Sequence, residues 1–168
     1  MRDALSCGSS RVFNISRTPP AQSLQSLRKF SHITCDLTDE ASILSLFGRL
    51  KLEFESLDKF CLDNFARPPR VLLVNNAGFG LFGEFVTADL DEELRMIDTN
   101  VKGLLYITHE VAPLMIKNEK GHIVNIASVA GKEVYPGGNV YCATKHAVDA
   151  LSKAMRIDML KHNIKVTN

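Results

Sequence analysis

Short apolar runs alternate with longer amphipathic stretches along this chain, and this rhythm is the feature that most constrains its fold. Residues 71–74 (VLLV) form a continuous apolar run, which is typical of a strand covered by helices on both faces of a parallel sheet. Residues 122–127 (HIVNIA) form a second such strand, and residues 140–161 have the spacing of a long helix. Strands that alternate with helices in this way predict an α/β fold with a parallel sheet.

The remaining elements follow from the same spacing and from the positions of glycine and proline. We expect further strands at residues 11–16, 32–35 and 164–167, and a loop with paired prolines at residues 18–26. We expect helices at about residues 91–99 and 101–117. Thr38 or Asp39 is placed to cap another helix, which runs to about Phe65 and stops before Pro68. No repeat or linker interrupts this order, so we expect a single domain over residues 1–168.

The composition is that of an ordinary globular domain and argues against several classes of function. The 168 residues are 45% apolar and 23% charged, and the net charge of +1 gives no field that would draw the chain to nucleic acid or to an anionic membrane. The longest apolar runs fall far short of the ~20 residues that a membrane span needs. The N-terminus has no apolar signal-peptide core. We therefore expect neither a nucleic-acid nor a membrane partner.

The cysteines are widely scattered, at Cys7, Cys35, Cys61 and Cys142. They form no CxxC pair and have no metal-ligand spacing. Such cysteines are typical of reduced thiols in a cytoplasmic protein rather than of a disulfide framework or a zinc site. The expectation is a cytoplasmic protein without a bound metal.

Tyr141 and Lys145 form the most informative pair in the sequence, because they stand four residues apart and share one face of the predicted helix. A tyrosine with the ordinary pKa of about 10 is a poor proton-transfer group at neutral pH. A neighbouring ammonium favours the phenolate, so the pair makes a usable general acid and base. Taken alone, this spacing is more often that of a half-buried tyrosine beside a solvated lysine.

Three further features stand where they could serve a ligand site, and two of them follow the carboxyl ends of strands, outside which ligands bind in an open parallel sheet. Ser128 follows the strand at residues 122–127 and is able to bind a substrate carbonyl oxygen, with a loop or capping serine as the alternative. Residues 75–78 (NNAG) follow Val74, and their glycine permits either close approach to a ligand or a plain turn. Asn100 is a mediocre helix former in a predicted helical region, where it serves a site or decorates a solvated face.

Together these residues resemble the short-chain dehydrogenase/reductase family, and the resemblance runs from about Arg11 to the C-terminus. It rests on four motifs in the family's order and spacing: N-N-A-G, the catalytic asparagine in MIDTNVKG, the serine, and Y-x-x-x-K. The matching residues are Asn75, Asn76, Ala77, Gly78, Asn100, Ser128, Tyr141 and Lys145. The stretch GGNVYCATK resembles in particular the branch that contains NADP-dependent 3-hydroxy acid dehydrogenases.

The resemblance implies a fold and a reaction. The fold is a Rossmann-like doubly wound parallel sheet, and the reaction is hydride transfer between NADP(H) and a small carbonyl or alcohol substrate. Tyr141 is then the general acid and base, and Ser128 orients the substrate oxygen. Lys145 lowers the Tyr141 pKa and binds the nicotinamide ribose, and Asn100 supports Lys145 through a water-linked relay. Residues 75–78 are implied to bind the cofactor.

Arg17 indicates which cofactor to expect. It follows the strand at residues 11–16, at the place where an acidic residue would bind the 2′-hydroxyl of NAD. A guanidinium there suits the 2′-phosphate of NADP, so we expect NADP with NAD as the alternative, although an arginine at a strand end is also simply solvent-exposed. The resemblance implies that Asp36 and Leu37 contact the adenine, while helix capping is another role for Asp36.

The sequence departs from the family pattern at both ends. Only residues 7–10 (CGSS) stand before the strand that should come second, so the opening strand, the loop T-G-x-x-x-G-x-G and the first helix have no counterpart. The final strand and the substrate lid are missing after Asn168. We expect an incomplete sheet, in which residues 11–16 and 71–74 pair directly or leave unpaired edges. The alternative to an enzyme is a non-catalytic fragment or inactive paralogue that keeps the catalytic residues but binds cofactor poorly.

The resemblance also implies a homo-oligomer. In the family, the helices that carry Asn100 and Tyr141 commonly pack against a second subunit. Apolar residues of these helices fit a core or an interface equally well: Leu104, Leu105, Ile107, Val148 and Leu151.

Overall fold

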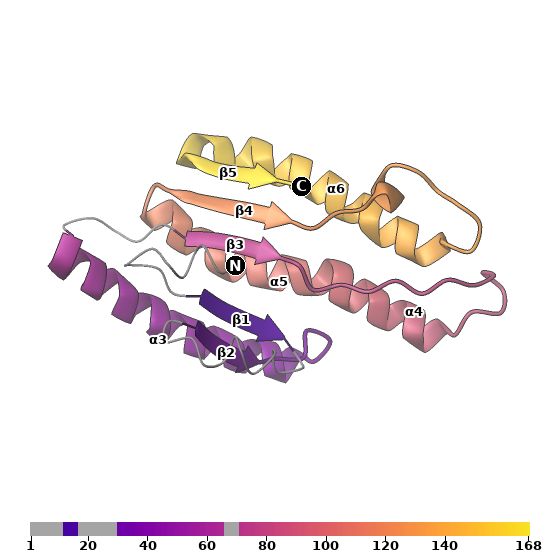
Figure 1. Ribbon diagram of the computed structural model, residues 1–168, viewed down its shortest axis with the longest axis horizontal. Helices are drawn as coiled ribbons and strands as arrows, with labels where there is room; N and C mark the ends of the chain where they lie inside the picture. The colour runs from indigo at the N-terminus through magenta and orange to yellow at the C-terminus, as the bar shows by residue number, and fades with distance from the viewer. Residues whose placement is uncertain (1–11, 17–29, 66–70) are drawn as a thin grey trace. The chain divides into compact units, whose positions relative to one another are not determined.

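A computed structural model describes residues 12–16, 30–65 and 71–168 of the chain (Figure 1). The chain divides into two compact units, Met1–Arg49 and Leu50–Asn168. The single domain expected over residues 1–168 stays a prediction.

The described part of the first unit holds two parallel strands and the start of a long helix. β1 (Val12–Ser16) pairs with β2 (Phe30–Thr34) along their full length. The helix α3 (Glu40–Phe65) begins after Asp39, whose carboxylate accepts a hydrogen bond of 2.8 Å from the Ser42 N–H. Of the two predicted caps, Asp39 is therefore the one that serves. The buried apolar side chains of this part are Ile33, Cys35, Ile43 and Leu46.

Three parallel strands form the sheet of the second unit: β3 (Val71–Asn75), β4 (Gly121–Asn125) and β5 (Ile164–Thr167). They lie in the order β3-β4-β5, with Val71 opposite Gly121 and Gly121 opposite Ile164. The predicted parallel α/β arrangement is confirmed. β4 ends at Asn125 rather than at residue 127. The Ile126 N–H still donates a hydrogen bond of 2.9 Å to the Asn75 carbonyl oxygen, and the chain then leaves the sheet.

Besides the end of α3, the α-helices of this unit are α4 (Leu90–Ile97), α5 (Gly103–Lys117) and α6 (Asn139–Met159). A π-helical segment, η1 (Asp98–Lys102), joins α4 to α5, and a 3-10 turn, η3 (Leu160–His162), follows α6. α5 and α6 lie on the same side of the sheet in Figure 1. The layer between them and the sheet is apolar, with Ile107, Met115, Ile123 and Val148 buried.

The apolar run of β3 predicted burial on both faces of the strand, but one face is exposed. Successive residues of a strand point to opposite faces. Val71 is buried, whereas Leu72 and Val74 are 58% and 49% exposed. The run therefore indicates a strand correctly, but it does not tell which of the two faces other elements cover.

Candidate functional site

The candidate residues of the second unit gather at the carboxyl end of the sheet. Parallel strands bring their carboxyl ends to one edge. Here the loop of residues 76–89 leaves β3, the segment that begins at Ile126 leaves β4, and both meet the first turns of α6 (Figure 1). The side-chain contacts of these three segments define the site.

Tyr141 and Lys145 lie on the first two turns of α6. The Lys145 ammonium stands 5.9 Å from the centroid of the Tyr141 ring. It donates a hydrogen bond of 2.9 Å to the carbonyl oxygen of Ile126, and Lys145 is only 8% exposed. A buried ammonium requires such a partner, so this bond fixes the cation between the helix and the end of β4.

The Tyr141 ring is held by the loop after β3. A Cβ at Gly80 would lie 2.9 Å from Tyr141 Cδ2, so only glycine leaves room for the ring. The Phe82 ring meets the Tyr141 ring edge-on, with 5.7 Å between the centroids. Sequence reasoning missed both residues, although the glycines and phenylalanines of residues 78–83 (GFGLFG) are a visible signal of a tightly packed loop.

Asn100 lies within η1 and is 2% exposed, so it does not decorate a solvated face. Its Oδ1 accepts a hydrogen bond of 3.0 Å from the Phe79 N–H, and its Nδ2 donates 2.8 Å to the Phe79 carbonyl oxygen. Nδ2 also donates 3.1 Å to Oγ1 of Thr144, which lies between Tyr141 and Lys145 on α6. One amide thus ties the loop after β3 to the helix of the candidate acid and base.

Gly78 marks the point where Asn100 and Lys145 converge. A Cβ built on Gly78 would stand 3.0 Å from Asn100 Oδ1 and 3.8 Å from Lys145 Nζ. A Cβ at this position would crowd the Asn100 amide oxygen and would be in ordinary contact with the Lys145 ammonium, so glycine permits the close approach. Asn76, Ala77 and Gly78 are all exposed, which leaves the backbone of this loop open to a ligand.

Asn75 turns away from these loop residues and toward the helices. Its Nδ2 donates a hydrogen bond of 2.9 Å to Thr108 Oγ1 on α5 and another of 2.8 Å to Asn125 Oδ1 on β4. Asn125 is 1% exposed and donates 2.8 Å to Ser152 Oγ on α6. Sequence reasoning missed Asn125, whose signal is a lone amide inside the apolar run HIVNIA. These side chains brace the ends of the strands that carry the site.

Ser128 begins the 3-10 turn η2 (Val129–Gly131). Its Oγ accepts a hydrogen bond of 3.2 Å from the Ala130 N–H, and its carbonyl oxygen accepts 3.0 Å from the Gly131 N–H. This is the capping role that the sequence offered as the alternative. Because Oγ acts as an acceptor in this bond, its own O–H remains a donor for a substrate oxygen.

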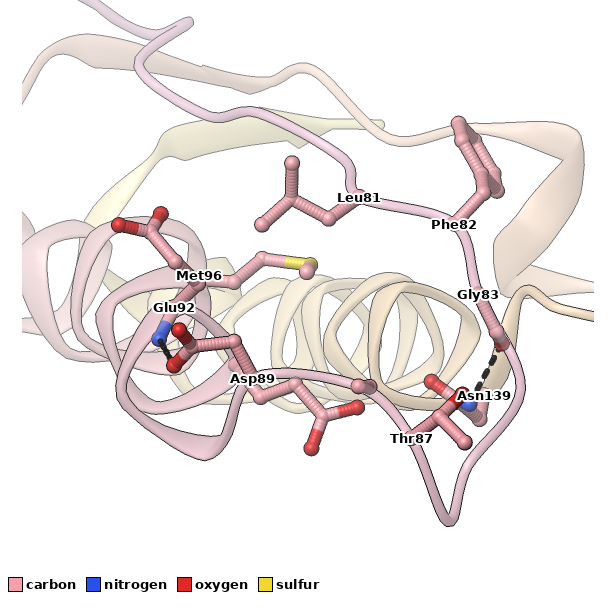
Figure 2. Close-up of a pocket in the computed structure, with 10 residues that line it drawn as sticks. Leu81, Phe82, Gly83, Thr87, Asp89, Glu92, Met96 and Asn139 are labelled. Atoms are coloured by element: carbon pink, nitrogen blue, oxygen red, sulfur yellow. Dashed lines mark hydrogen bonds between the residues drawn. The ribbon is translucent and has the colours of Figure 1, made fainter.

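A pocket of about 290 Å³ lies beside the cluster, between the loop after β3, α4 and the start of α6 (Figure 2). Phe82 lines this pocket and also contacts Tyr141. Figure 2 shows Asn139 closing one end, where its Nδ2 donates 3.2 Å to the Gly83 carbonyl oxygen. The walls combine apolar and acidic side chains: Leu81, Met96, Asp89, Glu92 and Glu93.

The remaining candidates belong to the first unit. Asp36 Oδ1 accepts hydrogen bonds from the Thr38 N–H at 3.0 Å and the Thr38 hydroxyl at 2.7 Å, which forms a turn just before α3. Leu37 is half-buried in the same turn. Arg17 lies outside the described residues. The structure therefore brings the candidates of the second unit together, and it describes Asp36 and Leu37 within the first unit alone.

The described part of the chain contains neither a metal-ligating cluster of side chains nor a helix that could span a membrane. Within residues 12–16, 30–65 and 71–168, no group of three or more histidine, cysteine, aspartate or glutamate side chains is arranged to hold a metal ion. No helix in these ranges is long and apolar enough to cross a membrane. Cys35 and Cys142 are buried free thiols, and burial raises the pKa of the Cys35 thiol, which disfavours the reactive thiolate.

Comparison with known proteins matches most of the sequence. Residues 9–168 match the model of the short chain dehydrogenase family. The chain is 38% identical over 134 residues to the NADP-dependent 3-hydroxy acid dehydrogenase of Shigella flexneri, covering 79% of this chain and 49% of that protein. It is 29% identical over 178 residues to the protein of the same name from Schizosaccharomyces pombe, covering 95% of this chain and 64% of that protein. The chain thus spans less than two thirds of these relatives, which bear the name of the branch that GGNVYCATK resembles.

Solved structures extend the comparison to the fold. The closed form of serine dehydrogenase complexed with NADP+ gives a TM-score of 0.77 at 33% identity, covering 98% of this chain and 62% of that chain. A 4-hydroxyisoleucine dehydrogenase complexed with NADH and succinate gives 0.79 at 27% identity, covering 99% of this chain and 70% of that chain. These likenesses confirm the predicted Rossmann-like fold class.

Proposed function

Because the chain belongs to the short-chain dehydrogenase family, we propose that it carries the hydride-transfer site of an NADP-dependent oxidoreductase that interconverts a carbonyl and an alcohol. The observation that carries this proposal is the framework in which Asn100 and Lys145 tie the loop after β3, the end of β4 and the helix of Tyr141 to one another. The relatives named NADP-dependent 3-hydroxy acid dehydrogenases support the reaction and the cofactor.

Tyr141 is the proton donor when the carbonyl is reduced. The reduced nicotinamide, when bound, supplies the hydride that adds to the carbonyl carbon. The Tyr141 hydroxyl gives its proton to the carbonyl oxygen, which leaves the alcohol, and the reverse reaction returns that proton to Tyr141. Ser128 holds the same oxygen through its O–H donor, on the strand-end segment next to α6.

Lys145 supplies positive charge where Tyr141 becomes negative on proton transfer. An ammonium has three donors, and among the described residues the Ile126 carbonyl oxygen takes one of them. We assign the others to the nicotinamide ribose and to a water chain that leads toward Asn100. The convergence of Lys145 and Asn100 on Gly78 supports this relay.

The residues at the sheet edge fit a cofactor that approaches the backbone closely. The missing side chain of Gly78 leaves that approach open, and Asn76 and Ala77 beside it are exposed. We assign these three residues to the cofactor, with Asn75 bracing the strand from which they extend. The adenosine end is assigned to three residues of the first unit, with the guanidinium on the 2′-phosphate of NADP: Arg17, Asp36 and Leu37.

We also propose that the chain forms a homo-oligomer through the helices that carry Asn100 and Tyr141, which are the run from α4 through η1 to α5, and α6. An exposed apolar stripe supports this, since Leu90, Leu94, Ile97 and Leu105 are 64%, 49%, 41% and 41% exposed. Leu94→Glu should convert the oligomer to a monomer in sedimentation equilibrium, and a wild-type chain that is monomeric at every concentration would contradict the proposal.

We also propose that the protein is cytoplasmic, because its free thiols suit the reducing cytoplasm.

Titration of NADPH into the full chain by calorimetry tests the cofactor assignment, after circular dichroism establishes that the chain is folded. Binding in the micromolar range supports the assignment. A folded chain with no detectable binding would contradict it and would favour the non-catalytic alternative.

Replacement of Tyr141 tests the reaction itself. Tyr141→Phe should abolish turnover with a carbonyl substrate and leave NADPH affinity nearly unchanged, because it removes only the transferable proton. Tyr135→Phe is the matched control, since Tyr135 also packs near the Phe82 ring but has no assigned role. Turnover near the wild-type rate in Tyr141→Phe would overturn the assignment.

A further inference from the structure

The segment that carries Ser128 is a compact turn that lies directly on α6. Ala130 is 1% exposed, and the Ser128 hydroxyl and carbonyl oxygens bind the next N–H groups of the turn. A Cβ at Gly131 would stand 2.6 Å from the carbonyl oxygen of Lys145. The turn and the helix therefore meet backbone to backbone, one residue before Lys132.

Lys132 fastens this turn to α6 through Asp149. The Lys132 ammonium donates 2.6 Å to Asp149 Oδ1, and Asp149 lies one helical turn beyond Lys145. Asp149 is 7% exposed, so its carboxylate depends on partners. Lys153 Nζ lies 2.7 Å from Asp149 Oδ2, and Asn168 Nδ2 donates a hydrogen bond of 2.7 Å to Asp149 Oδ1. The hydrogen bond from Lys132 is the main cause that holds the pKa of Asp149 well below its usual range.

We propose that Asp149 is a positioning residue for Ser128: through Lys132 it fixes the serine-bearing turn against the helix that carries Tyr141 and Lys145. The inference rests on the proposed function, because Ser128 matters to turnover only if it holds the substrate oxygen. The carboxylate binds the Lys132 ammonium at the end of the turn through Oδ1, whereas Lys153 binds Oδ2 from the same helix as Asp149. Substitutions of Lys132 and of Lys153 can therefore distinguish the loss of the positioning contact from a general loss of stability of α6.

Kinetics on the full chain test the positioning role. Lys132→Met should lower kcat by about tenfold through misplacement of Ser128, and Lys132→Arg should restore most of it. Lys153→Met, which removes an equally exposed lysine from the same carboxylate, should keep kcat. In a Ser128→Ala background, Lys132→Met should have no further effect, because both changes act through one group. Additive effects of the two substitutions would overturn the proposal.

Amide hydrogen exchange gives a readout that does not depend on activity. Lys132→Met and Asp149→Asn should accelerate exchange at Gly131 and Lys132 by about tenfold, while Lys153→Met leaves it unchanged. Unchanged exchange in both variants would refute the positioning role even in an active enzyme. A chain that is inactive but shows the expected exchange would refute the proposed function alone and leave the anchoring by Asp149 established.

Discussion

Gly80 lies directly against the ring of Tyr141, and three ring carbons would stand between 2.9 and 3.2 Å from a Cβ at this position. Gly80→Ala should therefore displace the ring, which Phe82 confines from another side. We expect the free energy of unfolding to fall by about 1–2 kcal/mol, as for other overpacked sites, and turnover to fall with it. Gly83→Ala is the control, because nothing lies within 4 Å of its Cβ. Equal effects of the two substitutions in thermal unfolding and turnover would contradict this account.

Asn100 should prove to be a structural clamp as well as a candidate relay residue. Asn100→Ala leaves the N–H and carbonyl oxygen of Phe79 without their side-chain partners, which should cost about 2–3 kcal/mol of unfolding free energy. Asn100→Asp keeps the acceptor but places a carboxylate oxygen against the Phe79 carbonyl oxygen, so it should be at least as destabilising as alanine. Urea denaturation measures the series, and an alanine variant as stable as wild type would show that the clamp contributes nothing.

Glu93 should be a site where removal of charge stabilises the fold. Its Oε1 is buried without a hydrogen-bond partner among the described residues, and the side chain lines the pocket of Figure 2. An unpaired buried polar atom costs about 1–3 kcal/mol, so Glu93→Leu should raise the free energy of unfolding by about 1 kcal/mol. The Glu92 carboxylate pairs with Arg95 at the surface, so Glu92→Leu should change the free energy of unfolding by less than ~1 kcal/mol. A less stable Glu93→Leu variant would contradict the prediction.

Asp149 should give stability a defined dependence on pH. Hydrogen bonds from Lys132 and Lys153 hold the pKa of the Asp149 carboxyl well below its usual range. The folded state therefore binds fewer protons than the unfolded chain below the ordinary aspartate pKa of about 3.9. The stabilisation is complete above that value and is lost as the pH falls through the lower folded-state pKa.

Denaturation of wild type and Asp149→Asn at several pH values checks this sign. The difference in unfolding free energy between them should be constant from about pH 7 to about pH 5 and should shrink below about pH 4. Asp98→Asn, which breaks the exposed pair with Lys102, should differ little from wild type throughout. A difference between wild type and Asp149→Asn that grows on acidification would contradict the sign.

The sequence indicated the strands and helices of the described part because their apolar spacing is local. The helix face shared by Tyr141 and Lys145 and the cap at Asp39 follow from the same kind of short-range rule. The exposed face of β3 was not predictable in this way. An apolar run has the same letters whether one face or both are covered, so the exposure of Leu72 and Val74 depends on the tertiary arrangement.

The π-helical turn at Asn100 and the amide network of Asn125 were hidden for a related reason. Asn100 binds the backbone of Phe79 and Asn125 binds Asn75 and Ser152, all distant in the sequence. A polar residue in an apolar context indicates that a partner exists, since an unpaired buried amide is costly. It does not name the partner, which only the packing of strands against helices brings within reach.

The two hydrogen bonds between Asn100 and the Phe79 backbone also divide the loop after β3 into a part held through its main chain and a part that follows it. Asn100 grips the main chain at residue 79, so the grip does not depend on which side chain stands there. Beyond it, Leu81, Phe82, Gly83 and Thr87 line one wall of the pocket, and the side chains of Leu81 and Thr87 are exposed. Mutations of Leu81 or Thr87 can therefore reshape this wall while the Asn100 amide keeps its place next to α6.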